Sequence, residues 1–316
     1  MNEADVIAAL RALATHPAAR GLRDDAAVID VPLGRRLVAT HDVLVEGVHY
    51  TPACPAGDVA WKLVATNLSD LAAMGATPLG MLLGLTLARE AVWTADFIAG
   101  LGRVAALWDC PLLGGDTVSG PAVLGLTALG AAAAPLSRMG ARVGDELWLS
   151  GTVGDAGLGL RMALGEMAVE GVLLKRYRRP VPRLGLGAAL AGVASAAMDV
   201  SDGLLIDAAR LGEASGVGVA IELDAVPLSD AVRALLPAGE AGVLAAAASG
   251  DDYELLFTAA PAAAGAVRAA GAAGKVAVTR IGRVLAGAGL RLRGADGPVA
   301  LPARLGFEHG RGCNAG

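Results

Sequence analysis

AGDVAWKLVATNLSDLAAM, residues 56–74, is the stretch that decides how the first half of the chain folds. Its apolar side chains recur at helical spacing, which predicts one long helix with a buried stripe. Gly75 and Pro78 follow, and both residues are typical of the end of a helix. The apolar run at 79–87 then reads as a buried strand, so this region predicts a helix followed by a strand.

Outward from this stretch, short apolar runs alternate with helical patterns along the chain. We expect further helices over 6–13 and 94–107, and strands over 36–40, 111–113, 122–129, 146–150 and 276–284. The strand at 36–40 is expected to end at His41-Asp42, and the strand at 111–113 at Gly114-Gly115-Asp116. This alternation predicts a mixed α/β fold in two domains, residues 1–137 and residues 138–316.

Length and composition agree with a two-domain globular protein. The chain has 316 residues, about twice the usual size of a domain. Hydrophobic residues make up 54% and charged residues 18%, which excludes a disordered chain. The formal net charge of -5 argues against nucleic acid or an anionic membrane as the main partner.

Compartment and redox state are predicted from three features. The long uncharged stretch 117–137 is interrupted by Pro121 and Pro135, so we read it as a strand and a turn instead of a membrane span. The acidic first residues lack a signal-peptide pattern. An odd number of widely spaced cysteines fits neither a disulfide framework nor a zinc site: Cys54, Cys110 and Cys313. We expect a cytoplasmic protein that does not cross a membrane.

Aspartates beside glycines and expected strand ends are the main chemical signal. These aspartates are Asp25, Asp42, Asp116, Asp199 and Asp202. Ligand sites in α/β proteins collect at strand ends, and Mg²⁺ binds through a few carboxylates together with substrate phosphates. For any single one of these aspartates, an ordinary role in a turn or a helix cap is the favoured interpretation. Taken together, they favour a magnesium–phosphate site.

Three further features each have a structural alternative. Asn67 and Asp70 share one helix face and could project together into a site, or form a solvent-facing stripe. His49 could meet an anionic substrate group, although a lone histidine is more often structural. The glycines Gly151, Gly154 and Gly157 precede a helix and could cradle a phosphate or form a tight turn.

Several known nucleotide-binding and catalytic motifs are absent from the sequence. It contains no P-loop, protein-kinase motif set, convincing dinucleotide fingerprint or nucleophile elbow. An ATP-using enzyme with this sequence would therefore hold the nucleotide through aspartates and metal ions.

Six segments in one order resemble the thiamine-monophosphate kinase family, within the superfamily of aminoimidazole-ribotide-synthetase-like proteins. The segments are GLRDDAAV (21–28), THDVLVEGVH (40–49), NLSDLAAMG (67–75), GGDT (114–117), MDVSDGL (198–204) and SGDDYELL (249–256). The resemblance implies the two-domain fold of that superfamily and a homodimer in which the N-terminal sheets of two subunits join.

The resemblance also implies an activity and the residues that serve it. The activity is transfer of the ATP γ-phosphate to thiamine monophosphate, with several magnesium ions. Magnesium ligands by matching position are Asp25, Thr40, His41, Asp42, Asp70, Asp116, Asp199 and Asp202. ATP contacts are Gly115, Arg138 and Ser201, and contacts to thiamine monophosphate are His49, Asp251 and Phe307. The acceptor is already an anionic phosphate oxygen, so no residue is assigned as a general base or a covalent nucleophile.

The sequence departs from the family pattern at four positions. Arg23 replaces a glycine, His41 a threonine and Asp251 a glutamate, and Gly310 stands where a phenylalanine is usual. At His41, a magnesium contact requires the backbone carbonyl. At Asp251, the substrate-facing acid is one methylene shorter.

Two alternative classes of function stay open. One is another ATP-dependent enzyme of the superfamily: a ribotide synthetase, a selenophosphate synthetase or a hydrogenase-maturation enzyme. Cys54 lies too far inside the chain for the selenophosphate type, and Cys313 is not the last residue, as the hydrogenase type requires. The other class is a non-catalytic nucleotide-binding protein that kept the fold.

Overall fold

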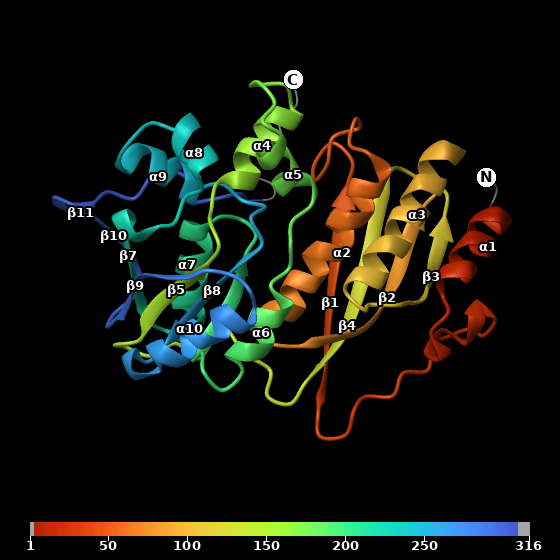
Figure 1. The fold of residues 1–316 in the computed structure, drawn as a ribbon, viewed down its shortest axis with the longest axis horizontal. Helices are drawn as coiled ribbons and strands as arrows, with labels where there is room; N and C mark the ends of the chain where they lie inside the picture. The colour runs from red at the N-terminus through yellow and green to blue at the C-terminus, as the bar shows by residue number, and fades with distance from the viewer. Residues whose placement is uncertain (1–2, 309–316) are drawn as a thin grey trace. The chain divides into compact units, whose positions relative to one another are not determined.

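The computed structural model describes residues 3–308 of the chain (Figure 1). It forms two compact units: unit 1 runs up to Pro135 and includes Arg178–Leu184, and unit 2 contains Leu136–Tyr177 and the residues from Gly185 onward. The sequence prediction set one boundary after residue 137 and did not include the return of 178–184 to unit 1. Gly310 and Cys313, named above, lie outside the described residues.

Unit 1 is a four-stranded sheet with the strand order β1-β4-β2-β3. β2 and β3 are parallel, and the other neighbours are antiparallel. Its elements are α1 (Glu3–Leu13), η1 (Pro17–Leu22), β1 (Arg36–Val45), α2 (Ala56–Ala73), β2 (Thr77–Thr86), α3 (Ala91–Leu107), β3 (Leu112–Val118) and β4 (Val123–Ala132).

Helix α2 is the centre of the unit 1 core, as its apolar stripe predicts. It packs against strands β1, β2 and β4 and against helix α3. Val59, Leu63, Leu68 and Leu71 are completely buried. The long helix and the strand after it are confirmed, and the helix ends where Gly75 and Pro78 predict.

The predicted ends of two strands are wrong. β1 continues beyond Thr40 to Val45, and β3 continues through Gly114-Gly115-Asp116 to Val118. Asp42 and Asp116 therefore lie inside strands and not after them. The reason is that pairing with β4 and β2 continues through these residues, while their polar side chains lie on faces that are partly open.

Unit 2 is built around a mixed seven-stranded sheet with the order β11-β10-β7-β9-β5-β8-β6, in which only β10 and β7 pair in parallel among the described strands. Its helices are α4 (Asp155–Ala163), α5 (Gly171–Arg178), α6 (Leu184–Leu190), α7 (Leu204–Ser215), η2 (Leu223–Ala225), α8 (Asp230–Leu235), α9 (Glu240–Ala247), η3 (Pro261–Ala263) and α10 (Ala264–Ala273). Its strands are β5 (Glu146–Ser150), β6 (Ala196–Val200), β7 (Gly218–Glu222), β8 (Glu254–Ala259), β9 (Val278–Leu285), β10 (Gly289–Gly294) and β11 (Gly297–Val299).

The uncharged stretch 117–137 contains the end of β3, a turn and β4, as expected. None of the helices within residues 3–308 combines the length and the apolar character that a membrane crossing needs.

Candidate functional site

Strand β1 and helix α2 bring together four polar residues of unit 1. The Thr40 hydroxyl donates to Oδ2 of Asp70 at 2.5 Å, and the Asp42 amide donates to Oδ1 of Asn67 at 3.1 Å. Asn67 is completely buried, and its Nδ2 donates to the carbonyl oxygen of Leu63 at 2.9 Å. Asn67 and Asp70 therefore both face strand β1, and the expectation that they project together into a functional site stays a prediction.

The carboxyl group of Asp42 has an unusual affinity for its proton. Burial raises the pKa of Asp42 to about 6, and the negative charge of Asp70 adds to the rise. The Thr66 hydroxyl and His41 oppose it. Two carboxylates that disfavour each other's ionisation in a partly buried position are suited to receive a cation.

His41 lies between these residues in sequence, but its side chain is on the other face of the sheet. Its Nδ1 forms a hydrogen bond with the Thr127 hydroxyl at 2.9 Å, on the neighbouring strand β4. The ring packs where a Cβ on Gly125 would come within 3.2 Å of it. Any role of His41 beside Asp42 is thus limited to its backbone carbonyl.

Asp116 and Gly115 lie on β3, at the opposite edge of the sheet from Asp42. Three strand spacings of about 4.8 Å separate the two edge strands, so their backbones are about 14 Å apart. This distance is too large for Asp42 and Asp116 of one chain to bind the same Mg²⁺ ion. Gly115 has φ +152°, and a Cβ there would meet the Leu83 carbonyl oxygen at 2.0 Å, so only glycine fits.

Asp25 lies in an exposed segment near the same edge strand. Ala27 and Ile29, just beyond it, pack against a small core cluster that includes Leu113 of β3. The neighbouring Asp24 forms an ion pair with Arg20 at 2.8 Å. Unit 1 therefore holds its predicted magnesium ligands in two groups, one at each edge of the sheet. Within residues 3–308, no three His, Cys, Asp or Glu side chains are close enough to form a metal site by themselves.

His49 lies in a tight segment between β1 and α2. The Val45 amide donates to Nδ1 of the imidazole at 2.9 Å. Nζ of Lys62, a buried residue of α2, donates to the His49 carbonyl oxygen at 3.0 Å. The sequence analysis did not select Lys62. The signal that could have indicated it was a lysine within an otherwise apolar stretch of helix.

In unit 2, three predicted contact regions meet through main-chain hydrogen bonds. The Asp251 amide donates to the Ser201 carbonyl oxygen at 2.7 Å, and the Phe307 amide donates to that of Asp202 at 2.8 Å. The Tyr253 hydroxyl donates to Oδ1 of Asp251 at 3.2 Å. Asp251 has a left-handed backbone, with φ 69°. Residues expected to contact ATP, magnesium and thiamine monophosphate thus lie on adjoining loops.

Asp207 and Arg210 of α7 organise the loop that carries Ser201 and Asp202. Oδ2 of Asp207 accepts hydrogen bonds from the amides of Ser201, Asp202 and Gly203 at 3.0–3.2 Å. Nη1 of Arg210 donates to Asp207 at 2.8 Å and to Asp202 at 2.5 Å. Burial raises the pKa of Asp207 to about 6, the charge of Asp202 adds to the rise, and the Asp202 amide and Arg210 oppose it. The sequence analysis did not select either residue. The signal that could have indicated Asp207 was an acidic residue in the first turn of a helix, directly after a loop whose amides need acceptors.

The glycine-rich turn before α4 is a structural turn. Its amides at Gly154 and Ala156 donate to the carboxylate of Asp252 at 2.8 and 3.2 Å. A Cβ on Gly151 would meet Glu254 at 2.1 Å. An internal carboxylate therefore occupies the position where a phosphate was considered. Burial raises the pKa of Asp252 well above its usual range, against the two amide hydrogen bonds.

Arg138 lies away from Ser201 within unit 2. Its carbonyl oxygen accepts from the Ser215 hydroxyl at 2.7 Å, at the last residue of α7. Ser201 precedes the first residue of the same helix. A helix of 12 residues is about 18 Å long, so only an extended ligand could contact both Ser201 and Arg138.

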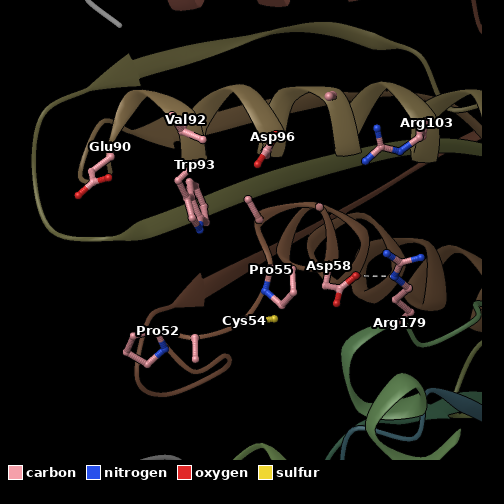
Figure 2. A pocket seen from close by; sticks show the side chains of 14 residues that line it. Pro52, Cys54, Pro55, Asp58, Glu90, Val92, Trp93, Asp96, Arg103 and Arg179 are labelled. Atoms are coloured by element: carbon pink, nitrogen blue, oxygen red, sulfur yellow. Dashed lines mark hydrogen bonds and ion pairs between the residues drawn. The ribbon is translucent and has the colours of Figure 1, made fainter. Parts of the chain in front are cut away.

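Unit 1 also contains a cavity of about 590 Å³ (Figure 2). Segment 52–58 and helix α3 line it. Arg179, from the segment that returns to unit 1, forms an ion pair with Asp58 in its wall. None of the predicted site residues lines this cavity.

Comparison with known proteins gives the same family for both halves of the chain. Residues 23–132 match the family model of the AIR synthase related protein, N-terminal domain, and residues 142–295 match that of the C-terminal domain. A thiamine-monophosphate kinase from Caulobacter vibrioides is 43% identical over 306 residues, which cover 93% of this chain and 86% of the relative.

Solved structures agree with this match. The crystal structure of thiamine-monophosphate kinase from Stenotrophomonas maltophilia is 38% identical, with a TM-score of 0.83, over 94% of this chain and 96% of its own. A structure described as AaThiL complexed with AMPPCP and TMP is 31% identical, with a TM-score of 0.78, over 90% and 91%. The predicted two-domain fold is confirmed, and the chain belongs to the thiamine-monophosphate kinase family of AIR synthase related proteins.

Proposed function

We propose that this protein transfers the γ-phosphate of ATP to thiamine monophosphate and forms thiamine diphosphate. The observation that carries the proposal is the likeness over nine-tenths of the chain to a structure described with AMPPCP and TMP. It is supported by the adjoining loops of unit 2, where Ser201, Asp202, Asp251 and Phe307 lie in sequence-matched positions. Asp251 and Phe307 would contact thiamine monophosphate, and Ser201 would contact ATP together with Gly115 and Arg138.

Magnesium is the metal that the donor set fits. Asp42 and Asp70 offer carboxylate oxygens and Thr40 a hydroxyl, all hard ligands, and burial together with the charge of Asp70 raises the pKa of Asp42, so a cation would stabilise its ionised form. The remaining ligands would be substrate phosphate oxygens and water. Asp25 and Asp116 would serve a different ion at the β3 edge, and Asp199 and Asp202 one in unit 2. When bound, magnesium neutralises charge on the phosphates.

The protein's own residues would bind and align the two substrates. Both reactants are anions, and the attacking phosphate oxygen needs no residue to remove a proton near neutral pH. His49 would donate a hydrogen bond from its imidazole to thiamine monophosphate, and Asp251 would hold the other end of the substrate. Alignment and charge neutralisation are sufficient for direct in-line transfer.

We also propose that the protein is a homodimer joined through the unit 1 sheet. The face of this sheet that carries His41 exposes Leu37 and Val43, which are 53% and 40% accessible. Exposed apolar side chains on a sheet face favour burial against a second copy. Light scattering at micromolar concentration should give the mass of two chains. A fully active monomer would contradict this assembly.

The cytoplasm is the compartment we propose, because the reaction consumes ATP, which is made available there. Fractionation of cells that express the protein should recover thiamine-monophosphate kinase activity in the soluble cytoplasmic fraction.

A single assay tests the activity. Purified protein is incubated with Mg-ATP and thiamine monophosphate, and thiamine diphosphate and ADP are quantified together. Equal amounts of the two products are expected. ATP consumption without thiamine diphosphate would instead favour another enzyme of the superfamily, and binding of ATP with no turnover would favour a non-catalytic relative.

A further inference from the structure

Lys62 places an ammonium group inside unit 1, next to the segment that carries His49. Its side chain is 2% exposed, and its Nζ donates to the His49 carbonyl oxygen at 3.0 Å. Burying an ammonium group costs several kcal/mol unless hydrogen bonds and charges compensate it. Its helix neighbours Val59 and Leu63 are buried aliphatic residues, so packing of α2 does not itself require a lysine at this position.

The imidazole of His49 has one defined hydrogen-bond donor. Because the Val45 amide donates to Nδ1 at 2.9 Å, Nδ1 acts as an acceptor and the ring hydrogen lies on Nε2. The Val45 carbonyl oxygen also accepts from the amides of Val48 and His49 at 3.1 and 2.9 Å. The direction of the Nε2–H bond therefore depends on the main chain of 45–49.

Two basic side chains, Arg89 and Lys62, make polar contacts with the main chain around His49. Residues 52–54, which continue the segment, line the 590 Å³ cavity of Figure 2. On that side Arg89 donates to the Pro52 carbonyl oxygen at 2.8 Å and pairs with Glu46 at 3.1 Å. Lys62 provides the corresponding contact directly at His49.

We infer that Lys62 is a positioning residue for His49: its ammonium group fixes the main chain that carries the imidazole and so aims the Nε2–H donor at thiamine monophosphate. This inference rests on the proposed function. It concerns a residue that does not itself touch the substrate.

The test compares three variants of the full-length protein. Lys62→Met removes the donor and keeps an unbranched side chain, while Lys62→Arg keeps a cationic donor. Val64→Ala is the matched control, because Val64 is completely buried on the same helix and its truncation weakens the same core. The two KM values, kcat and the melting temperature are measured for each variant.

We expect Lys62→Met to raise the KM for thiamine monophosphate about tenfold and to change the KM for ATP less than about twofold. Lys62→Arg should recover most of this loss. Val64→Ala should lower the melting temperature and leave both KM values near wild type. Equal increases in both KM values for Lys62→Met, or no change in either, would overturn the inference.

A spectroscopic measurement separates this inference from the proposed function. Histidine ¹H–¹⁵N spectra, assigned with His49→Gln, should show the Nε2–H tautomer of His49 in the wild type and in Val64→Ala, and a mixture of tautomers in Lys62→Met. If the wild type makes no thiamine diphosphate, the proposed activity fails and the spectra alone decide. An unchanged His49 signal in Lys62→Met would then refute the positioning role.

Discussion

The buried carboxylates of the two units are stabilised in opposite ways. In unit 1, Asp42 lies beside Asp70, and hydroxyl groups provide the hydrogen bonds around them. In unit 2, the Asp207 carboxylate accepts hydrogen bonds from three backbone amides and from Arg210. The pKa of Asp42 and that of Asp207 are both raised to about 6 by burial, so the pKa alone does not distinguish them. What differs is the immediate partner of each carboxylate: Asp207 accepts hydrogen bonds from three amides and an arginine, whereas the charge of Asp70 opposes ionisation of Asp42.

The largest expected effect is on activity, at Asp42. Asp42→Asn should reduce kcat/KM by about 100-fold or more, because an amide cannot supply the charge that holds magnesium. The melting temperature of the metal-free variant should stay at or above that of the wild type, since the variant no longer buries a repelled carboxylate. Activity is measured over a magnesium titration. Near-wild-type turnover at limiting magnesium would remove Asp42 from the metal site.

The second effect is on stability, at Asp207. Asp207→Ala should lower the free energy of unfolding by about 3 kcal/mol, because three amides and Arg210 lose their shared acceptor. Urea denaturation measures the change. If Asp207→Ala were as stable as Asp42→Asn, the contrast between the two units would be wrong.

The third effect is the pH dependence of stability. The pKa of Asp42 is about 6 in the folded protein against 3.8 for an aspartate in the unfolded chain, so between these values the folded state binds more protons than the unfolded state. Asp42 therefore destabilises the protein above pH 6, and this cost disappears as the pH falls through the folded pKa. With magnesium removed, the free energy of unfolding of the wild type should rise by about 2 kcal/mol relative to that of Asp42→Asn as the pH falls from 7 to 4.5. Parallel curves for the two proteins would contradict the raised pKa.

The smallest expected effect is on substrate binding, at Asp251. Because Asp251 has a left-handed backbone, Asp251→Asn removes the charge without straining the loop. We expect it to raise the KM for thiamine monophosphate about tenfold with little change for ATP. Asp251→Glu, which restores the family's longer acid, should be tolerated. Equal KM values for wild type and Asp251→Asn would leave Asp251 as only a turn residue.

The sequence predicted the elements of the core well, because periodic apolar residues report burial directly. The stripe of α2 and the strand after it are examples. The predicted ends of β1 and β3 were wrong, because polar residues such as Asp42 continue a strand whose backbone partners lie far away in sequence. Long-range pairing of this kind leaves no local signal.

In the candidate site, too, local sequence signals were detected and long-range contacts were not. Motif resemblance selected Ser201, Asp251 and Phe307, and the fold brings these residues onto adjoining loops. The supporting residues Lys62 and Asp207 were missed, because their roles depend on backbone groups that only the folded chain brings near them.

The return of residues 178–184 to unit 1 has a consequence for synthesis on the ribosome. The Trp61 indole donates to the Pro180 carbonyl oxygen at 2.6 Å, Arg179 pairs with Asp58, and Leu184 packs against the unit 1 core. Unit 1 therefore cannot complete its contacts until residues 136–177 of unit 2 and the returning segment 178–184 have also left the exit tunnel, several seconds later at ordinary translation rates. A nascent chain released at residue 137 would leave a partly buried tryptophan nitrogen and a buried aspartate without these partners, so unit 1 would lack both contacts throughout this interval.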